Sequence, residues 1–361
     1  MKPFETRRMI VIVLLSYLGC SPEPTTDEMI IFSESSFKNY DLRGEEILKN
    51  ELGVIALHVI DTLVLIEFME KGDWVYQVYG TQNFSYIGGL GKIGDGPNEW
   101  RGPRFSGQTE QSETTLGLWV NDMRHRNFQL IDVYKSIDKS EPVVISSKKY
   151  PSDLNMNQNL FYLNASRWVG NLGPNAKERN QLLIYNPLLD TSETIPFSIK
   201  VANSELLNTS EQYSTYFTYL ALKPDKTKLV SVMNHLSRID VFDLKNKPIR
   251  QSTTVSKEEK HNDLDGEIIK RDRSYLFNYY MWAFATDSYI YALYHGQSGS
   301  KYAKDLISTE IRVFDWNGNP VAKLNIPEYL WSFSVDEKNG FIYGVSYFQE
   351  KSMRYPFSLN E

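Results

Sequence analysis

The residue types that carry most enzyme and metal chemistry form no recognisable pattern in this sequence. None of the five histidines stands at the spacing of a metal-binding motif. They are His58, His125, His235, His261 and His295. The 45 Asp and Glu residues are too numerous for one pair to stand out as the two carboxylates of a glycoside hydrolase. We assign no catalytic residue and no metal ligand, although a ring of repeats would gather scattered histidines around its axis.

Three short motifs look like chemical sites but have a simpler interpretation. The glycines of residues 91–96 suggest a phosphate-binding loop, yet a proline follows them and no helix pattern does. We expect a turn between strands, in which the glycines supply positive φ angles. Residues 261–272 suggest a calcium loop but begin with His and lack the final Glu, so we expect a solvated loop. Residues 296–300 lack the Gly-x-Ser-x-Gly pattern of a hydrolase nucleophile.

Two aromatic-rich segments, residues 213–219 and 275–282, are the most suggestive features of the sequence. Exposed rings beside polar side chains can stack on sugars or hold the apolar anchor of a partner protein. The alternative is that these rings pack between neighbouring sheets. The candidate ligand-binding residues are Tyr216, Tyr219, Tyr279, Tyr280, Trp282 and His295.

The elements that must position these residues are short β-strands that recur along the chain. A polar turn runs into an apolar strand six times, and successive copies lie roughly 56 residues apart. The copies are residues 61–66, 113–120, 166–170, 225–230, 287–293 and 339–345. Stacking such repeats in a ring buries both faces of each sheet. The sequence predicts an all-β, six-bladed propeller with four-stranded blades; seven blades, or a two-sheet sandwich with an extra domain, are the alternatives.

Two further expectations concern the ends of the ring and its largest interruption. An apolar segment, residues 29–32, precedes the first repeat, and another, residues 353–357, follows the last one. We expect the two to share the last blade and lock the ring. The charged residues 255–273 predict a long surface loop or a short helix on one rim.

The first residues have the pattern of an export signal. Arg7 and Arg8 precede a short apolar run that ends at Cys20, after a glycine, and this arrangement resembles a bacterial lipobox. We expect a signal peptide over residues 1–20, lipid attachment at Cys20, a flexible tether over 21–28 and one propeller domain over 29–361. The alternative is an ordinary secretory cleavage site that leaves a free cysteine.

Composition narrows the function classes. The formal net charge of −6 argues against binding to a nucleic-acid backbone, which favours a basic surface. A mean hydropathy of −0.41 excludes a protein with many membrane spans. With one Cys, the chain forms no internal disulfide and no cysteine-based zinc site. We expect no cofactor.

Residues 86–100 read Tyr-Ile-Gly-Gly-Leu-Gly-Lys-Ile-Gly-Asp-Gly-Pro-Asn-Glu-Trp, and residues 290–296 read Ile-Tyr-Ala-Leu-Tyr-His-Gly. Together with the lipobox, they resemble the TolB-like six-bladed propeller lipoproteins of Bacteroidetes-type bacteria, the BF3164-like group. In that group a Gly-x-Gly-Pro-x-Glu-aromatic turn closes an early blade. The resemblance covers most of the chain after Cys20 and implies a six-bladed propeller on a lipid anchor. It implies no catalytic residues.

These observations favour a binding or scaffold module in the cell envelope, held at the outer membrane by its N-terminal lipid. Loops on a rigid propeller bind a protein partner or a glycan without any sequence motif. The alternative is an enzyme that acts on envelope or extracellular glycans with its site at the central channel. A structural part of a larger envelope complex is a third possibility.

Overall fold

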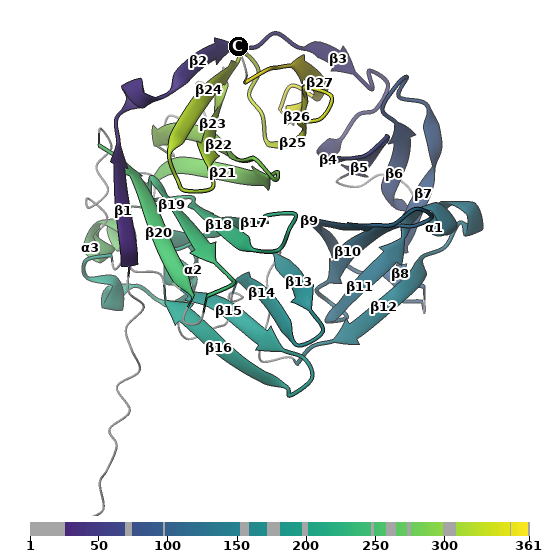
Figure 1. The fold of residues 1–361 in the computed structure, drawn as a ribbon, viewed down its shortest axis with the longest axis horizontal. Helices are drawn as coiled ribbons and strands as arrows, with labels where there is room; N and C mark the ends of the chain where they lie inside the picture. The colour runs from purple at the N-terminus through teal and green to yellow at the C-terminus, as the bar shows by residue number, and fades with distance from the viewer. Residues whose placement is uncertain are drawn as a thin grey trace, which may run out of the picture.

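The computed structural model describes residues 26–68, 74–96, 98–151, 159–171, 181–196, 201–246, 249–257, 265–272, 276–298, 308–346 and 348–359. These residues form six sheets around a central axis, so that each sheet is one blade of a propeller (Figure 1). The expected all-β, six-bladed architecture is therefore confirmed, and the seven-bladed alternative is wrong. The predicted signal peptide, Cys20 and most of the predicted tether lie outside the described residues.

The blades follow one another along the chain, and the first strand named in each lies at the axis. Blade 1 contains β4 (Val54–Ile60), β5 (Leu63–Phe68), β6 (Trp74–Gly80), β7 (Tyr86–Ile93) and β8 (Glu99–Trp100). Blade 2 contains β9 (Pro103–Gln111), β10 (Leu116–Asp122), β11 (Asn127–Asp132) and β12 (Val143–Lys149). Blade 3 contains β13 (Leu160–Asn164), β14 (Arg167–Asn171), β15 (Gln181–Asn186) and β16 (Thr191–Pro196).

Blades 4 to 6 each include one strand from the N-terminus. Blade 4 contains β17 (Thr218–Leu222), β18 (Lys228–Met233), β19 (Arg238–Asp243), β20 (Arg250–Ser256) and β1 (Thr26–Phe32). Blade 5 contains β21 (Phe277–Ala285), β22 (Tyr289–Ser298), β23 (Thr309–Asp315), β24 (Pro320–Ile326) and β2 (Lys38–Asp41). Blade 6 contains β25 (Ser332–Asp336), β26 (Phe341–Ser346), β27 (Lys351–Pro356) and β3 (Glu45–Ile47).

The six predicted repeats correspond to the second strand of each blade, and the alternation of side chains explains why these strands are apolar almost throughout. In β5, Leu63 and Leu65 pack against blade 2, whereas Val64 and Ile66 pack against blade 6. A strand sends successive side chains to opposite faces of its sheet. Because a neighbouring blade covers each face, both sets of side chains must be apolar. Six clusters of buried side chains result, one at each junction between blades.

Ring closure differs from the prediction. Residues 29–32 do not join the last blade, because β1 pairs in parallel with β20 at the outer edge of blade 4. After β1, the chain adds β2 in parallel to β24, and β3 then supplies the fourth strand of blade 6 by pairing with β27. We call residues 26–47 the N-terminal strap, because they run around the outside of three successive blades (Figure 1). The strand that closes the ring, β3, is short and partly exposed, and it therefore has no apolar pattern to reveal it.

Buried rings and charges hold the strap in place. Phe32 and Phe37 of the strap pack edge to face with Phe314 of blade 5, at ring-centroid distances of 5.8 and 5.4 Å. The buried Arg312 guanidinium lies 2.9 Å from a carboxylate oxygen of Glu34, and Glu34 also pairs with Lys323. The charge of Arg312 is thus compensated inside the junction, as burial of a charge requires.

The helices in the described part of the chain are few and short. They are η1 (Glu34–Ser36), α1 (Val133–Lys139), η3 (Ser204–Leu206), α2 (Thr209–Thr215) and α3 (Gly266–Arg271). The charged segment 255–273 contains α3, which confirms the expected short helix. Among the helices formed by the described residues, none has the length and apolar character needed to cross a bilayer.

Candidate functional site

A cavity of ≈ 800 Å³ lies on the axis of the propeller, lined by residues from the first strand of every blade. Its exposed lining includes the turns that join the first and second strands, with Asp61, Pro224 and Asn339 among them. We call this end of the ring the cavity rim and the opposite end the far rim. The cavity therefore reaches solvent at the cavity rim.

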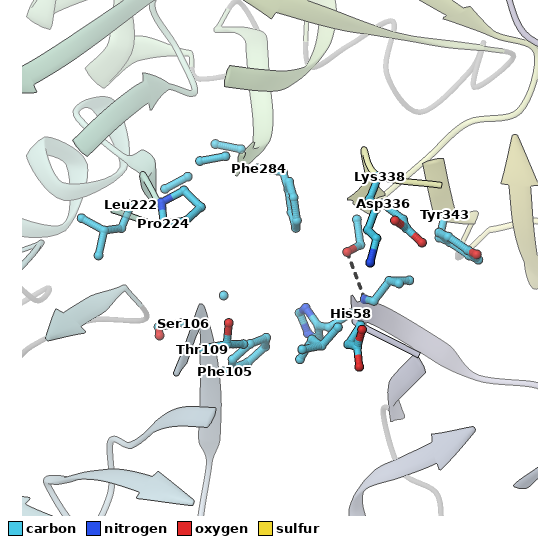
Figure 2. Close-up of a pocket in the computed structure, with 18 of the residues that line it drawn as sticks. His58, Phe105, Ser106, Thr109, Leu222, Pro224, Phe284, Asp336, Lys338 and Tyr343 are labelled. Carbon is cyan, nitrogen blue, oxygen red and sulfur yellow. Dashed lines mark hydrogen bonds between the residues drawn. The ribbon is translucent and has the colours of Figure 1, made fainter. Parts of the chain in front are cut away.

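His58 of β4 stands in the wall of this cavity (Figure 2). Its ring meets the ring of Phe105 edge to face, with 4.9 Å between centroids, and the side chain is almost fully buried. Burial, together with the nearby Arg104 guanidinium, lowers the pKa of His58 to about 4. The imidazole is therefore neutral at pH 7 and offers one hydrogen-bond donor and one acceptor.

Half-buried aromatic rings form much of the remaining wall. Trp282 and Phe284 stand two residues apart on β21 and both line the cavity. Figure 2 shows Phe284 and Phe105 projecting toward the hollow from different sides. Tyr219 of β17 lies beside Trp282, with 6.1 Å between ring centroids. The cavity thus offers apolar ring faces from blades 2, 4 and 5.

Polar and charged groups gather where the cavity meets the cavity rim. Asp336 ends β25, and its carboxylate accepts hydrogen bonds from the backbone and side-chain nitrogens of Asn339 at 3.1 and 2.7 Å. Lys338 lies between them in this turn and is exposed. The hydroxyl of Thr109 and the amide of Gln111 contribute from blade 2. Donors and acceptors therefore surround the mouth, while rings line the wall.

The structure brings two of the six predicted ligand-binding residues together in this cavity, namely Tyr219 and Trp282. Tyr216 is buried, and its hydroxyl accepts a hydrogen bond from the backbone nitrogen of Val201 at 2.9 Å. Tyr280 is buried in the core between blades 4 and 5. Tyr280 therefore packs between sheets, as the alternative interpretation expects, whereas Tyr216 packs in a separate cluster with Val201, Leu207, Ile269 and Leu276.

The other two predicted residues lie away from the cavity lining. Tyr279 stacks on Phe277 near the far rim, with 5.7 Å between centroids and 18° between ring planes. His295 packs against Tyr329 at 4.8 Å, and burial lowers the pKa of this histidine to about 4.

Phe105, Phe284 and Lys338 also line the cavity and are not among the residues predicted from the sequence. Phe284 could have been found from its spacing, because a residue two positions after Trp282 on a strand points to the same side of the sheet. Phe105 lies in β9, whose register with β10 shifts between Leu118 and Val120, and this irregularity breaks the alternating pattern. Lys338 belongs to a polar turn, and nothing in the sequence separates it from other turn lysines.

The four histidines that the structure describes do not converge on the axis. Among those that the structure describes, only His58 lines the cavity, and His125 instead pairs with the buried Asp122 at the junction of blades 1 and 2, 2.7 Å from a carboxylate oxygen. His261 lies outside the described residues, as does most of the predicted solvated loop. Within the described part of the chain, no group of three or more His, Cys, Asp or Glu side chains is placed to hold a metal ion.

The glycine-rich segment 91–96 closes blade 1 and does not begin a helix. Gly91 has φ +71° as expected, and a Cβ atom at this position would lie 2.2 Å from the ring of Trp100. Gly94 and Gly96 have no positive φ, so that part of the expectation is wrong. At Gly94 a Cβ atom would displace the carboxylate of Glu99, which accepts a hydrogen bond from the Gly96 nitrogen at 2.8 Å.

Several solved structures are similar to this chain. A solved member of the DUF4221 family from Bacteroides vulgatus is 12% identical, with a TM-score of 0.51 over 88% of this chain and 97% of that one. Raptor from Chaetomium thermophilum is 11% identical, with a TM-score of 0.49 over 89% of this chain and 29% of that one. A protein from Bacteroides fragilis is 10% identical, with a TM-score of 0.47 over 91% of this chain and 98% of that one.

At such low identities, the likeness to the Bacteroides vulgatus protein shows the fold alone. No curated protein matches the chain. The family model described as "TolB-like 6-blade propeller-like" matches residues 55–338, which extend from the first strand of blade 1 to the first turn of blade 6. The chain therefore belongs to the TolB-like six-bladed propeller family.

Proposed function

We propose that this chain is a binding propeller that holds a glycan in its central cavity and is attached to the cell envelope by a lipid on Cys20. The observation that carries the proposal is the composition of the cavity wall. The half-buried rings of Trp282, Phe284 and Phe105 face a space that is ringed by hydrogen-bonding groups at its mouth.

The size of the cavity fits an oligosaccharide of a few residues. Sites for small ligands occupy about 300–1,000 Å³ and combine apolar walls with a few placed polar groups. The cavity of ≈ 800 Å³ lies within this range. A pyranose ring has an apolar face of C–H groups and an edge of hydroxyls, so its face can stack on Trp282 or Phe284 while its hydroxyls reach the polar groups.

The polar groups suit hydroxyls better than a strongly charged ligand. His58 is neutral at pH 7 because burial lowers its pKa to about 4, so it offers the donor and acceptor that a sugar hydroxyl needs. Near the mouth, Asp336 and Lys338 carry opposite charges. The cavity therefore has no strong excess of one charge to select an anion or a cation.

The lipid anchor rests on the sequence alone. Cys20 is the single cysteine of the chain and follows a basic, then apolar segment that resembles a lipobox. The family group that the early-blade motif resembles also carries such an anchor. An envelope location places the cavity where glycans are abundant.

The test is oligosaccharide binding by the full chain carrying Cys20→Ala. A panel of neutral and uronate-containing oligosaccharides is screened by thermal shift and then by calorimetry. A ligand at 100 times its Kd raises the free energy of unfolding by about 2.7 kcal/mol. We expect at least one oligosaccharide to raise Tm, and Trp282→Ala to weaken its binding about tenfold or more, since aromatic contacts contribute about 1–3 kcal/mol.

Phe348→Ala is the matched control, because Phe348 is an exposed aromatic residue on the far rim, outside the cavity lining. It should leave the affinity unchanged. The proposal fails if no oligosaccharide binds, or if Phe348→Ala weakens binding as much as Trp282→Ala. Failure with every oligosaccharide would make a protein partner the better hypothesis.

A further inference from the structure

The N-terminal strap begins at the same end of the propeller as the cavity mouth. Backbone register across blade 4 shows this directly. Thr26 of β1 pairs with Gln251, Gln251 with Phe242, Phe242 with Leu229, and Leu229 with Leu222. Leu222 ends β17 and lines the cavity. The start of the strap therefore stands level with the cavity rim.

Strand direction leads to the same result. The first strand of each blade runs from the far rim to the cavity rim, the second runs back, and the fourth again runs toward the far rim. Because β1 is parallel to β20, the fourth strand of blade 4, it also runs toward the far rim. The chain thus enters the propeller at the cavity rim. Figure 1 shows that it does so on the outside of blade 4.

Cys20 lies only six positions before Thr26. Six residues of extended chain reach about 20 Å at most. A compact protein with the 361 residues of the whole chain has a radius of gyration of about 21 Å. A lipid on Cys20 would therefore keep the cavity rim close to the bilayer, since the tether is too short to pass around the propeller and present the far rim instead.

The exposed apolar side chains of the cavity rim fit such a position. Leu188 and Leu189 form the tip of the turn between β15 and β16, which also lies on this rim, and they are 66% and 71% exposed. Their backbone nitrogens donate to the Asn186 side chain at 3.0 and 3.3 Å, which fixes the turn. Leu189 is the most exposed large apolar side chain in the described part of the chain.

We infer that the central cavity opens toward the membrane that holds the lipid of Cys20, and that its ligand is the glycan headgroup of a lipid in that same membrane. This inference rests on the proposed function for the chemistry of the ligand. The orientation rests on the register of β1 and the length of the tether. The Leu188–Leu189 turn would contact the lipid surface beside the mouth.

Orientation is measured on the full, lipidated chain in vesicles of phosphatidylethanolamine and phosphatidylglycerol. Two single variants, Lys338→Cys and Lys351→Cys, place a fluorescent donor at opposite ends of blade 6, since Lys338 lies on the cavity rim and Lys351 begins β27 at the far rim. The native cysteine does not react, because its sulfur carries the lipid. Energy transfer to acceptor-labelled lipid headgroups reports the distance of each donor from the bilayer.

We expect the donor at position 338 to lie about 15–20 Å nearer to the bilayer than the donor at position 351, the length of a strand of six residues. Equal distances, or a shorter distance from position 351, would overturn the inference. A Leu188→Ser and Leu189→Ser double variant should increase the distance between the donor at position 338 and the bilayer. An unchanged distance would show that this turn does not contact the lipid surface.

The ligand is tested with the oligosaccharide found by the solution screen, coupled to a phospholipid. We expect the anchored protein to bind it when it is in the same vesicle, and not to capture separate vesicles that carry it. Capture of separate vesicles would overturn the inference while leaving the proposed function intact. If no free oligosaccharide binds in solution, the proposed function and the glycan ligand both fail, and energy transfer still decides the orientation.

Discussion

The backbone nitrogen of Val59 donates a hydrogen bond to the hydroxyl of Ser334 at 3.0 Å, although the two residues are 275 positions apart in the chain. Val59 lies on the first strand of blade 1 and Ser334 on the first strand of blade 6, and both line the central cavity. Both residues are buried. The bond therefore joins the first and last blades at the wall of the candidate site.

Replacement of Ser334 by Ala should destabilise the propeller, because it leaves the buried Val59 nitrogen without this acceptor. An unsatisfied buried donor costs about 1–3 kcal/mol. Urea unfolding measures the loss. Ser112→Ala, in an exposed turn of blade 2, is the control and should change stability by less than about 0.5 kcal/mol. Equal midpoints for the two variants would show that the bond does not support ring closure.

Replacement of Glu34 by Gln tests how the N-terminal strap is held. Glu34 contributes a negative charge to the buried Arg312, which also pairs with Glu310 at 2.6 Å. Loss of a hydrogen bond between charged groups costs about 1.5–3 kcal/mol. We expect a lower urea midpoint and faster proteolysis of the strap, with Glu113→Gln in an exposed turn as the control. An unchanged rate of proteolysis would mean that the aromatic contacts of Phe32 and Phe37 are enough to hold the strap in place.

Stability should fall as the pH falls through the range in which His58 titrates. Burial lowers the pKa of His58 from 6.5 to about 4. The unfolded chain then binds a proton at higher pH than the folded chain, so the stabilisation is complete above pH 6.5 and is lost between pH 6.5 and 4. The shift corresponds to about 3 kcal/mol. His58→Gln should flatten the dependence of unfolding free energy on pH in this range, and an unchanged slope would contradict it.

Replacement of Gly91 by Ala should cost more than the same change at Gly53. Both glycines have positive φ angles, +71° and +76°, so both variants carry a similar backbone strain. At Gly91 the added Cβ would also meet the ring of Trp100, whereas at Gly53 nothing lies within 4 Å. We expect the Gly91 variant to lose about 1–3 kcal/mol more by thermal unfolding. Equal losses would mean that Trp100 moves aside freely.

Replacement of Cys20 by Ala should release the protein from membranes. Without the thiol no lipid can be attached, and the described part of the chain has no helix able to cross a bilayer. Fractionation of cells, with immunoblotting of the membrane and supernatant, measures the change. Cys20→Ala protein that stays in the membrane fraction would show that the lipobox interpretation is wrong.

The architecture could be predicted because each blade repeats the same local requirement. The second strand of every blade is covered on both faces, so it needs apolar residues at successive positions, and the polar turn before it is equally constant. Residues 287–293 illustrate this, since Ile290 packs toward blade 4 and Tyr291 toward blade 6. Six such strands at regular spacing were enough to predict six blades.

The assembly of the site could not be predicted, because it depends on irregular first strands. Regular alternation would place Tyr280 and Trp282 on one face of β21. A register shift between these residues instead sends Tyr280 into the core between blades 4 and 5 and leaves Trp282 on the cavity wall. A bulge depends on pairing with the neighbouring strand, which leaves no local signal in the sequence.

The fold class and the repeat could thus be predicted from the sequence, because apolar alternation and turn residues act over a few neighbouring positions. The tertiary structure decided which rings face the cavity, which strand closes the last blade and at which rim the chain enters. These features arise from contacts between residues far apart in the chain, such as Thr26 with Gln251 and Val59 with Ser334. These contacts form only when the ring closes, so no short segment of the sequence reveals them.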